Sequence, residues 1–318
     1  MLPKSPEPTA VGACRCAVAS GGGRPDCMQS TNYTAMTGVR HGIVFTRTIF
    51  FCLLTALAVI MPKGIPAADS SQLITKSEAA GPGWELILDE HFNGPELDPK
   101  IWNIETGKRN DATNDASAVD LQDAKLVITT YTDTTGVTHC GFVTTRHKFL
   151  VAQGKAIARC RFSCQPGTQV AFWAQSPTYG KSGDPAQGAE DGVEIDIMET
   201  TGLRQGGYQY ALHWGSYGKT EMSSRRKFST PVGQDWHEYG VEWDDTGYRF
   251  TLDGKLVGTD STCPGSKVPE FFLLTSESKA KGRSWSGDRP ANGYGTKEKS
   301  TNKLEVAWVK VWKRVPAK

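Results

Sequence analysis

The chain has 318 residues, and its 36 Lys and Arg side chains nearly balance its 34 Asp and Glu side chains, which leaves a formal net charge of +2. The charge is near neutral and no Lys/Arg cluster is of the kind that indicates nucleic-acid binding, so a nucleic-acid partner is not expected. Nine tryptophans all follow residue 83, and their indole rings suit both a core and the stacking surfaces that bind sugars.

The first part of the chain contains a segment typical of an export signal. Arg40 and Arg47 precede an uncharged, apolar-rich run over residues 49–61. Such a run is too short to span a bilayer comfortably but suits the hydrophobic region of a signal peptide. We therefore expect a signal peptide over residues 36–68, cleaved near Ala67, and a secreted or periplasmic product. A retained membrane anchor is the alternative.

The segments on either side of this signal have no catalytic role in this interpretation. Residues 1–35 precede any ordinary signal peptide, so we interpret them as a non-native or dispensable upstream segment, with translation starting at Met28 or Met36. Residues 69–83 form a linker, and residues 84–318 are long enough for one catalytic domain.

Past residue 83, short β-branched and aromatic runs alternate with turns rich in Gly, Asp, Asn and Pro, and no stretch keeps a helical period. Strands are predicted at 125–131, 155–164, 170–175, 193–199, 208–214, 237–244, 248–252, 271–276 and 303–315. Asp253-Gly254, between two strand-like runs, is typical of a hairpin turn. Many short strands in one domain predict an all-β sandwich or barrel.

The hexapeptide E-I-D-I-M-E, Glu194 to Glu199, places three carboxylates in an apolar run that otherwise predicts a buried strand. Burying an unpaired carboxylate costs several kcal/mol, so the run either has one solvated face or uses its acids. Alternation puts Glu194 and Asp196 on one face and Glu199 on the other. A one-residue β-bulge near Ile197-Met198 would return Glu199 to the first face, and bulges are frequent beside active sites.

Carboxylates gathered on one face would influence one another's protonation. Two carboxylates about 5 Å apart repel by roughly 3 kcal/mol at an effective dielectric constant near 20, which corresponds to about two pKa units. One of them should keep its proton near neutral pH while another is ionised. A retaining glycosidase needs such a pair, one acid as nucleophile and the other as proton donor.

The hexapeptide resembles the catalytic signature of glycoside hydrolase family 16, the laminarinase and lichenase type of endo-β-glucanase, in its bulged, laminarinase-like branch. The resemblance runs from about Trp84 to Val315. Further blocks occur in the family's order: L-D-E-H-F-N-G at 88–94, C-G-F-V-T-T at 140–145, V-A-F-W-A-Q-S at 170–176, H-E-Y-G-V-E-W at 237–243 and L-D-G-K at 252–255. The resemblance implies a jelly-roll β-sandwich, similar to concanavalin, whose concave sheet forms the substrate cleft.

The resemblance also implies a role for each acid and for two neighbours. Glu194 would be the nucleophile, Glu199 the general acid and then base, and Asp196 a hydrogen-bonding partner that tunes their protonation. Trp173 would floor the subsite of the sugar whose bond breaks, or else lie in the core. His213 matches a family position near the acid, where it would orient Glu199, contact the leaving sugar or serve a structural role.

Two further substrate contacts are expected at the cleft rim. Trp285 lies in a Gly- and Ser-rich stretch typical of a loop, and loop aromatics flanked by small residues are often ligand contacts. Glu277 would bind a sugar hydroxyl near it. The basic run Arg225-Arg226-Lys227 is interpreted instead as a solvated loop.

Neither a metal nor a cofactor is expected. Many members of the family bind a structural calcium through an Asp in a V-D-Y-V pattern of the last strand, and Ala307 stands there without an oxygen ligand. The cysteines after residue 83 lack the spacing of a zinc site. As disulfides they allow three pairings, which the sequence leaves open; they are Cys140, Cys160, Cys164 and Cys263.

The expected partner of this chain, taken as a monomer, is a polysaccharide substrate. The favoured function is a secreted retaining endo-glycosidase that hydrolyses internal β-linkages, foremost those of a β-1,3- or mixed β-1,3/1,4-glucan. The alternatives are a non-catalytic, lectin-like carbohydrate-binding sandwich and a family enzyme that acts on an algal galactan or as a transglycosylase. A lectin has no need of three carboxylates, and a sulfated galactan would favour more Arg and Lys in the cleft than the sequence locates. Neither nucleic acid nor stable membrane association after processing is expected.

Overall fold

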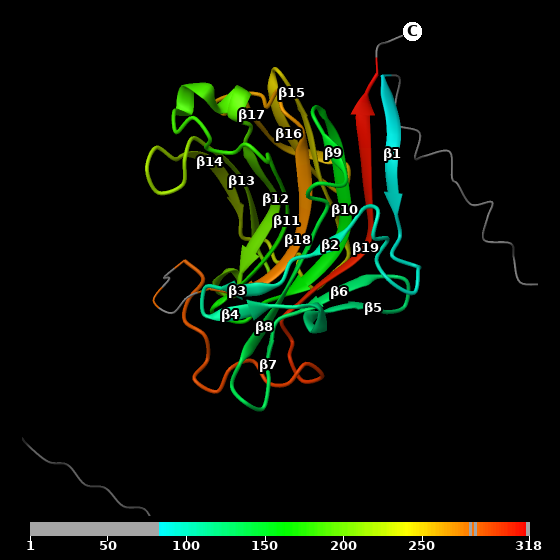
Figure 1. The fold of residues 1–318 in the computed structure, drawn as a ribbon, viewed down its shortest axis with the longest axis vertical. Coiled ribbons are helices and arrows are strands. Elements are labelled where there is room, and N and C mark those ends of the chain that lie inside the picture. Colours follow the sequence, from blue (N-terminus) through cyan, green and yellow to red (C-terminus); the bar gives the residue numbers. More distant parts are fainter. Residues whose placement is uncertain (1–82, 280–281, 283–284, 316–318) are drawn as a thin grey trace, which may run out of the picture. The chain divides into compact units, whose positions relative to one another are not determined.

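The computed structural model describes residues 83–315 except 280–281 and 283–284. These residues form two packed β-sheets (Figure 1). The predicted upstream segment, signal peptide and nearly all of the linker lie outside the described residues, so they stay predictions. No helix in the described residues is long and apolar enough to cross a membrane.

The first sheet has eight strands in the order β17-β16-β15-β10-β19-β6-β5, with β1 paired to β19. Burial alternates along the ten residues of β10, so every second side chain enters the core. The strands of this sheet are β1 (Trp84–Glu90), β5 (Val119–Leu121), β6 (Leu126–Thr129), β10 (Gly154–Ser163), β15 (His237–Asp244), β16 (Gly247–Leu252), β17 (Lys255–Asp260) and β19 (Lys303–Arg314).

The second sheet has eleven strands, and its main path is β14-β13-β12-β11-β18-β8-β4-β3. The short strands β2 and β7 pair with β8, and β9 pairs with β18. The strands are β2 (Asn103–Ile104), β3 (Gly107–Arg109), β4 (Ala112–Asn114), β7 (Tyr131–Thr132), β8 (Thr138–Thr144), β9 (Leu150–Val151), β11 (Thr168–Gln175), β12 (Glu194–Thr201), β13 (Tyr208–Trp214), β14 (Met222–Phe228) and β18 (Glu270–Ser278).

Helical structure in the described ranges is confined to short turns. The turns are η2 (Ala116–Ala118), η3 (Pro185–Gln187), α1 (Gly188–Asp191) and η4 (Gly202–Arg204). The expected all-β sandwich is therefore confirmed.

The main hydrophobic core contains side chains from both sheets, among them Phe172, Trp243 and Phe272, each almost fully buried. A second, smaller apolar cluster packs around Trp173 and Phe142. β12 is buried along its whole length. Its apolar residues enter the main core, and its acids line a cleft whose other polar side chains cover them.

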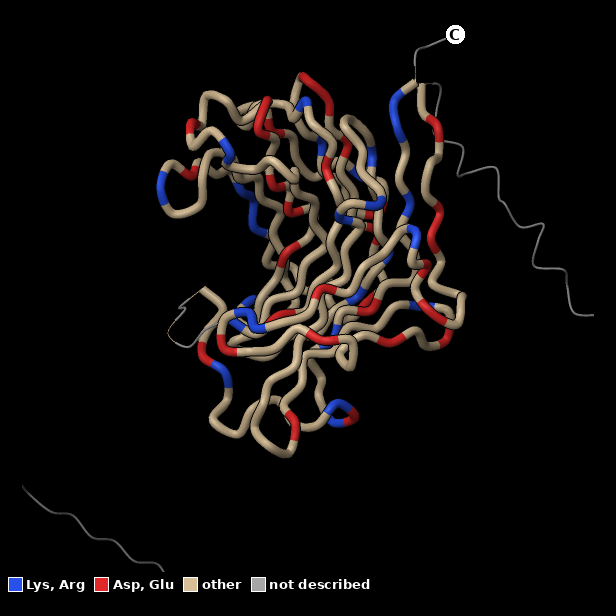
Figure 2. The backbone as a smooth tube through the Cα atoms, viewed as in Figure 1, with Lys and Arg blue, Asp and Glu red and all other residues tan. Residues whose placement is uncertain are grey.

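All nine predicted strands are present, with ends that differ by a few residues. The expectation of a solvated loop at Arg225-Arg226-Lys227 is wrong, because these residues belong to β14, an edge strand that pairs with β13. Edge strands commonly carry charged side chains, which discourage pairing with other chains and hide the apolar alternation of a strand. Figure 2 shows basic residues along this edge of the sheet.

Candidate active site

A β-bulge in β12 brings the three acids of the hexapeptide to one surface. β11 pairs Phe172 with Met198 but Trp173 with Asp196, so Ile197 is an extra residue without an opposite partner. Ile197 and Met198 both lie in the main core. Glu199 consequently returns to the face of the earlier acids, and the bulge predicted from the sequence is confirmed.

The start of β12 is fixed by a glycine and a buried acid. Gly192 has a φ of +78°, and a Cβ atom there would come within 2.2 Å of the Cβ atom of Ser176. The next backbone N–H, that of Val193, donates to Glu270 Oε1 at 3.3 Å. Burial raises the pKa of Glu270 to about 8. These contacts hold the backbone immediately before Glu194.

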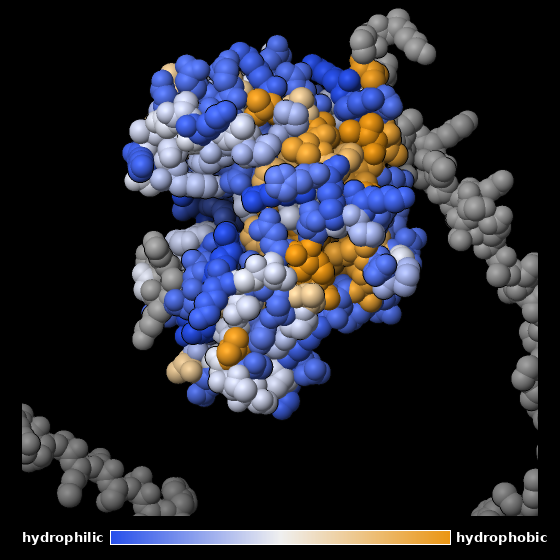
Figure 3. Space-filling view, viewed as in Figure 1, coloured by the Kyte–Doolittle hydropathy of each residue, from blue (hydrophilic) through white to orange (hydrophobic). Residues whose placement is uncertain are grey.

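The acids line an open cleft of about 550 Å³ on the second sheet. Figure 3 shows a hydrophilic hollow at the side of the molecule where β12, β13 and β14 lie. Each sequence-predicted site residue lines this cleft: Trp173, Glu194, Asp196, Glu199, His213, Glu277 and Trp285. Other lining residues include Arg109, Phe142, Arg146, Gln169, Gln175, Gln209, Tyr217, Arg225 and Lys279.

Glu194 is buried and receives two hydrogen bonds on the same oxygen. Gln175 Nε2 donates to its Oε2 at 2.8 Å, and the Tyr217 hydroxyl donates to that atom as well. Burial raises the pKa of Glu194, and the nearby charge of Asp196 raises it further. The two donors oppose this shift because they favour the ionised form.

Asp196 lies against a cationic imidazole. His213 Nε2 is 3.4 Å from Asp196 Oδ2, and its Nδ1 is 2.7 Å from Glu221 Oε1. Burial alone would lower the pKa of His213, but the contact with Asp196 prevails and raises it to about 9. These contacts place His213 beside Asp196, whereas one of the sequence alternatives had it orient Glu199.

Glu199 lies between two amide side chains. Gln169 Nε2 donates to its Oε1, and Gln209 Nε2 donates to its Oε2. Arg204 in turn donates to the Oε1 atom of Gln209. Burial raises the pKa of Glu199, the bond from Gln209 lowers it in part, and the charge of Glu194 adds to the rise.

Trp173 and Trp285 contribute aromatic surface of two kinds. Trp173 is only 8% exposed, packs edge-on against Phe142 and donates from Nε1 to Thr275 Oγ1 at 3.3 Å. It forms part of the cleft wall while it is anchored in the smaller apolar cluster. Trp285 is 41% exposed and also lines the cleft. Contact with a sugar stays a prediction for both.

Glu277 is held in ion pairs within the cleft. Arg109 Nε is 2.6 Å and Lys279 Nζ is 3.4 Å from its Oε2. Burial would raise the pKa of Glu277, but these two cations outweigh burial and lower it. Glu277 is thus an ionised acceptor at neutral pH, and its predicted bond to a sugar hydroxyl stays a prediction.

The cleft contains more basic side chains than the sequence interpretation located, which corrects that interpretation. Arg109 and Lys279 are neutralised by Glu277. Arg225 has no carboxylate partner among the described residues and donates to Ser223 Oγ at 2.9 Å. The full set is Arg109, Arg146, Arg225 and Lys279.

Several cleft residues were missed although the sequence carried a signal for some of them. Gln169 and Gln175 stand at even spacing from Trp173 on the same strand, so alternation places them on its face. Gln209 is related to His213 in the same way. Tyr217 lies in a connection between two strands, where no periodic pattern predicts its direction.

Metal ligation in the cleft is opposed by charge. One oxygen each of Glu194 and Asp196 and one nitrogen of His213 lie within 4.8 Å of one another. The contact with Asp196 raises the pKa of His213 to about 9 despite burial, so at neutral pH a metal would have to displace the proton of the imidazole before it could bind there. The residue at the family's calcium position, Ala307, likewise offers no side-chain oxygen.

The cysteines of the described residues are free thiols, so none of the three disulfide pairings occurs. Three of them are buried and one is partly buried; they are Cys140, Cys160, Cys263 and Cys164.

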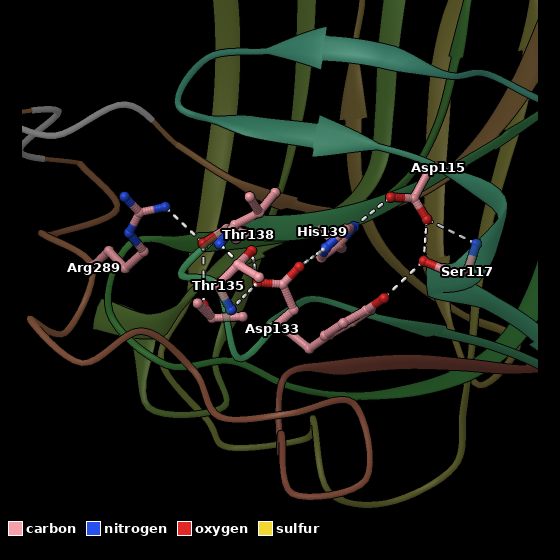
Figure 4. Close-up of polar contacts among 10 residues, drawn as sticks. Asp115, Ser117, Asp133, Thr135, Thr138, His139 and Arg289 are labelled. Carbon is pink, nitrogen blue, oxygen red and sulfur yellow. Dashed lines mark hydrogen bonds and ion pairs between the residues drawn. The ribbon is translucent and has the colours of Figure 1, made fainter.

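A second polar cluster, centred on His139 of β8, lies outside the cleft (Figure 4). The Nδ1 atom of His139 bonds to Asp115, and its Nε2 atom is 3.0 Å from Asp133 Oδ2. The imidazole stacks on Tyr131 with ring centroids 4.7 Å apart. Asp115 also caps η2 by accepting the backbone N–H of Ser117 at 2.8 Å. The cluster thus joins η2 to the β7–β8 hairpin.

Buried carboxylates in an open, aromatic-walled cleft on a β-sandwich define the class of protein, a glycoside hydrolase domain. Comparison with known families gives the same answer, because the model of the family described as Glycosyl hydrolases family 16 matches residues 106–310. The chain belongs to glycoside hydrolase family 16, and it has the jelly-roll fold of that family.

The chain is similar to two glucan-degrading proteins. It is 28% identical over 212 residues to glucan endo-1,3-beta-glucosidase A1 of Niallia circulans. The matched region covers 57% of this chain and 30% of that protein. It is 30% identical over 176 residues to a beta-glucanase of Fibrobacter succinogenes. This matched region covers 52% of the present chain and 45% of the relative. The chain therefore spans less than half the length of these curated relatives.

A solved structure agrees with the fold. The laminarinase catalytic domain of Thermotoga maritima superposes with a TM-score of 0.58 at 21% sequence identity, over 74% of this chain and all of that domain.

Proposed function

We propose that this chain is an endo-acting glycoside hydrolase that cleaves internal β-linkages of a polysaccharide with retention of anomeric configuration. The observation that carries the proposal is the bulge of β12, which places Glu194 and Glu199 in one cleft with different hydrogen-bond partners. The names of the two curated relatives make a β-1,3- or mixed β-1,3/1,4-glucan the first candidate substrate.

In this mechanism Glu194 is the nucleophile. Its two hydrogen bonds both fall on Oε2, which leaves Oε1 to attack the anomeric carbon. Glu199 protonates the glycosidic oxygen as that bond breaks, and a covalent glycosyl-enzyme forms. Ionised Glu199 then takes a proton from water, whose oxygen attacks the same carbon and releases the Glu194 carboxylate.

The surroundings of Glu199 suit a group that gains and loses a proton. Burial raises its pKa, so it holds a proton at higher pH than an exposed glutamate does. Gln169 donates to it through Nε2 while the Oε1 atom of Gln169 is buried without a partner among the described residues. Rotation of that amide would present an acceptor to a protonated Glu199, so the pair accommodates both states.

Asp196 and His213 complete the proposed mechanism as a charge-balancing pair. The positive charge of His213 lowers the pKa of Glu194 and of Asp196, against the larger effects of burial. His213 thereby offsets part of the rise in the pKa of Glu194 that burial and the charge of Asp196 cause, and so favours the ionised nucleophile.

The first test measures which anomer forms when laminarin is hydrolysed. Proton NMR during the first turnovers should detect the β-anomer before mutarotation. Glu194→Gln and Glu199→Gln should each lower kcat by about 10²-fold or more, with unchanged circular dichroism. Glu238→Gln, on the opposite sheet, is the matched control and should keep full activity.

Four outcomes would contradict the proposal. Initial release of the α-anomer would replace retention by inversion, and full activity in either cleft variant would remove that acid from the mechanism. Binding of laminarin without release of reducing ends would favour the lectin-like alternative. Longer products than the starting chains would indicate a transglycosylase.

Export is part of the same proposal and is supported by the apolar run at 49–61 behind Arg40 and Arg47. N-terminal sequencing of protein recovered from the culture medium or periplasm should give a start near residue 68. A product that begins upstream of residue 36 would contradict this.

A further inference from the structure

Unneutralised positive charge gathers on the side of the cleft formed by β13, β14 and η4. Register places Arg225 opposite Ala211 and Lys227 opposite Gln209. Gln209 binds Glu199 and lines the cleft, and directly opposed residues of antiparallel strands project from the same face. Arg225 and Lys227 therefore both point to the cleft side of β14.

Arg225, which lines the cleft, and its strand neighbour Lys227 differ from Arg109 and Lys279 in lacking carboxylate partners. On the far side, Arg109 and Lys279 are paired with Glu277. Within the described residues, the hydrogen bond of the Arg225 guanidinium goes to the Ser223 hydroxyl at 2.9 Å, and neither Arg225 nor Lys227 has a carboxylate within ion-pair distance. An exposed cation without a partner in a substrate cleft is available to an anionic ligand.

Arg204 adds a third donor at this place. Its guanidinium binds the Gln209 amide oxygen, and its Nε atom is buried without a hydrogen-bond partner among the described residues. Burial and the charge of Arg225 both lower the pKa of Arg204, although the charge of Glu199 opposes them, so Arg204 and Arg225 influence each other electrostatically. A buried N–H that lacks an acceptor costs stability unless a ligand or water supplies one.

We propose that Arg225 and Lys227, supported by Arg204, bind an anionic substituent on a sugar next to the bond that is cleaved. The chemical class is a sulfate ester or a carboxylate, because a guanidinium presents paired N–H donors to either group. β14 lies two strands from β12, which is about 10 Å across a sheet. The substituent therefore belongs to a flanking sugar and not to the reacting carbon. The inference rests on the proposed endo-hydrolase activity, and it departs from the neutral glucan named there as first candidate substrate by assigning the chain an acidic polysaccharide.

The competing explanation is that these charges only protect an edge strand from pairing with other chains. Edge protection needs charge on β14 but gives no reason for affinity toward anionic sugars. It also does not require the buried, unpaired Nε atom of Arg204, whose guanidinium binds Gln209 on the neighbouring strand. The two explanations differ in what the double variant R225Q/K227Q should do.

The test compares the binding of three forms of one glucan: laminarin, chemically sulfated laminarin and carboxymethylated laminarin. Calorimetry uses the full chain carrying Glu194→Gln, so that no probe is consumed, at about 0.01 M and about 0.15 M NaCl. At low salt, at least one anionic form should bind about tenfold tighter than laminarin. R225Q/K227Q should abolish that preference and its salt dependence, and lower the affinity for the anionic forms far more than the affinity for neutral laminarin.

The matched control is K100Q/K255Q, which removes the same net charge at exposed positions remote from the cleft and should keep the preference. The probe that shows the preference identifies sulfate or carboxylate as the recognised group. The inference is overturned if R225Q/K227Q still prefers the anionic forms, if it loses neutral laminarin equally, or if it aggregates without any change in affinity. Hydrolysis of laminarin by the wild-type chain is scored separately, so failure of the proposed function is distinguishable from failure of this inference.

Discussion

The acids of the cleft have the same chemistry but different neighbours. Glu194 receives a phenol and an amide on one oxygen, whereas Glu199 receives one amide on each oxygen. Asp196 faces the imidazolium of His213. Differences of this kind separate the pKa values of neighbouring carboxyl groups and so assign different tasks to them.

The role of His213 can be measured through the pH dependence of activity. Its positive charge lowers the pKa of Glu194, so His213→Asn should raise that pKa further above its ordinary value. In the proposed mechanism, activity requires ionised Glu194 and is lost as pH falls through the pKa of that residue. The acidic limb of the kcat/KM profile should therefore move to higher pH by about one unit.

His237→Asn is the control for this measurement, because His237 lies on the other sheet, where it contacts Asp253. An acidic limb that stays in place in His213→Asn would show that this histidine does not act on the protonation of Glu194. A loss of activity at every pH with an unchanged limb would assign it a structural role.

Among the elements, the β7–β8 hairpin and η2 are joined by His139 and its two aspartates. Burial alone would lower the pKa of His139, but the bonds to Asp115 and Asp133 raise it. A raised pKa in the folded state stabilises the fold fully below about pH 6.5, and this stabilisation is lost as pH rises through the folded value. The pKa values of both aspartates are lowered, so their contribution is present above about pH 4.

The cluster should therefore stabilise the fold most between about pH 4 and 6.5. His139→Gln should lower Tm by a few degrees at pH 5.5, which lies in that window, and by less at pH 9. Thermal unfolding followed by circular dichroism at both pH values checks this. His147→Asn, at an exposed position with a φ of +64° that Asn tolerates, is the control. An equal loss at both pH values would mean that packing against Tyr131, and not charge, is what His139 supplies.

For the molecule as a whole, the sequence predicted the sandwich, the bulge and the three acids because each rests on local alternation. The same alternation could also have placed Gln169 and Gln209 on the cleft face of their strands. Alternation could not place Tyr217, because its position depends on the path of the connection between β13 and β14. It could not place Arg225 either, because the edge strand β14 carries no apolar alternation. The partner of His213 depends on register, since β13 sets it opposite Glu194 while its Nε2 atom reaches Asp196.

Stability of the whole fold should not depend on calcium. Ala307 replaces the acidic ligand expected at the family's metal position, so excess EDTA and excess CaCl₂ should give Tm values within about 1 °C of each other. Differential scanning calorimetry checks this on the full chain. A rise of several degrees with CaCl₂ that EDTA reverses would reveal a calcium site built from other oxygens.

The bulge residue of β12, Ile197, couples the packing of the core to the spacing of the two glutamates. Ile197 and Met198 fill the interior directly behind the two glutamates, so a bulkier or smaller side chain there displaces the backbone that spaces the carboxyl groups. Screens for variants of higher thermal stability ordinarily substitute such core positions on the assumption that catalytic activity does not depend on them. Under the proposed mechanism, substitutions at these two positions would alter the rate as well, whereas repacking along β10 or β19, on the other sheet, would leave the glutamates in place.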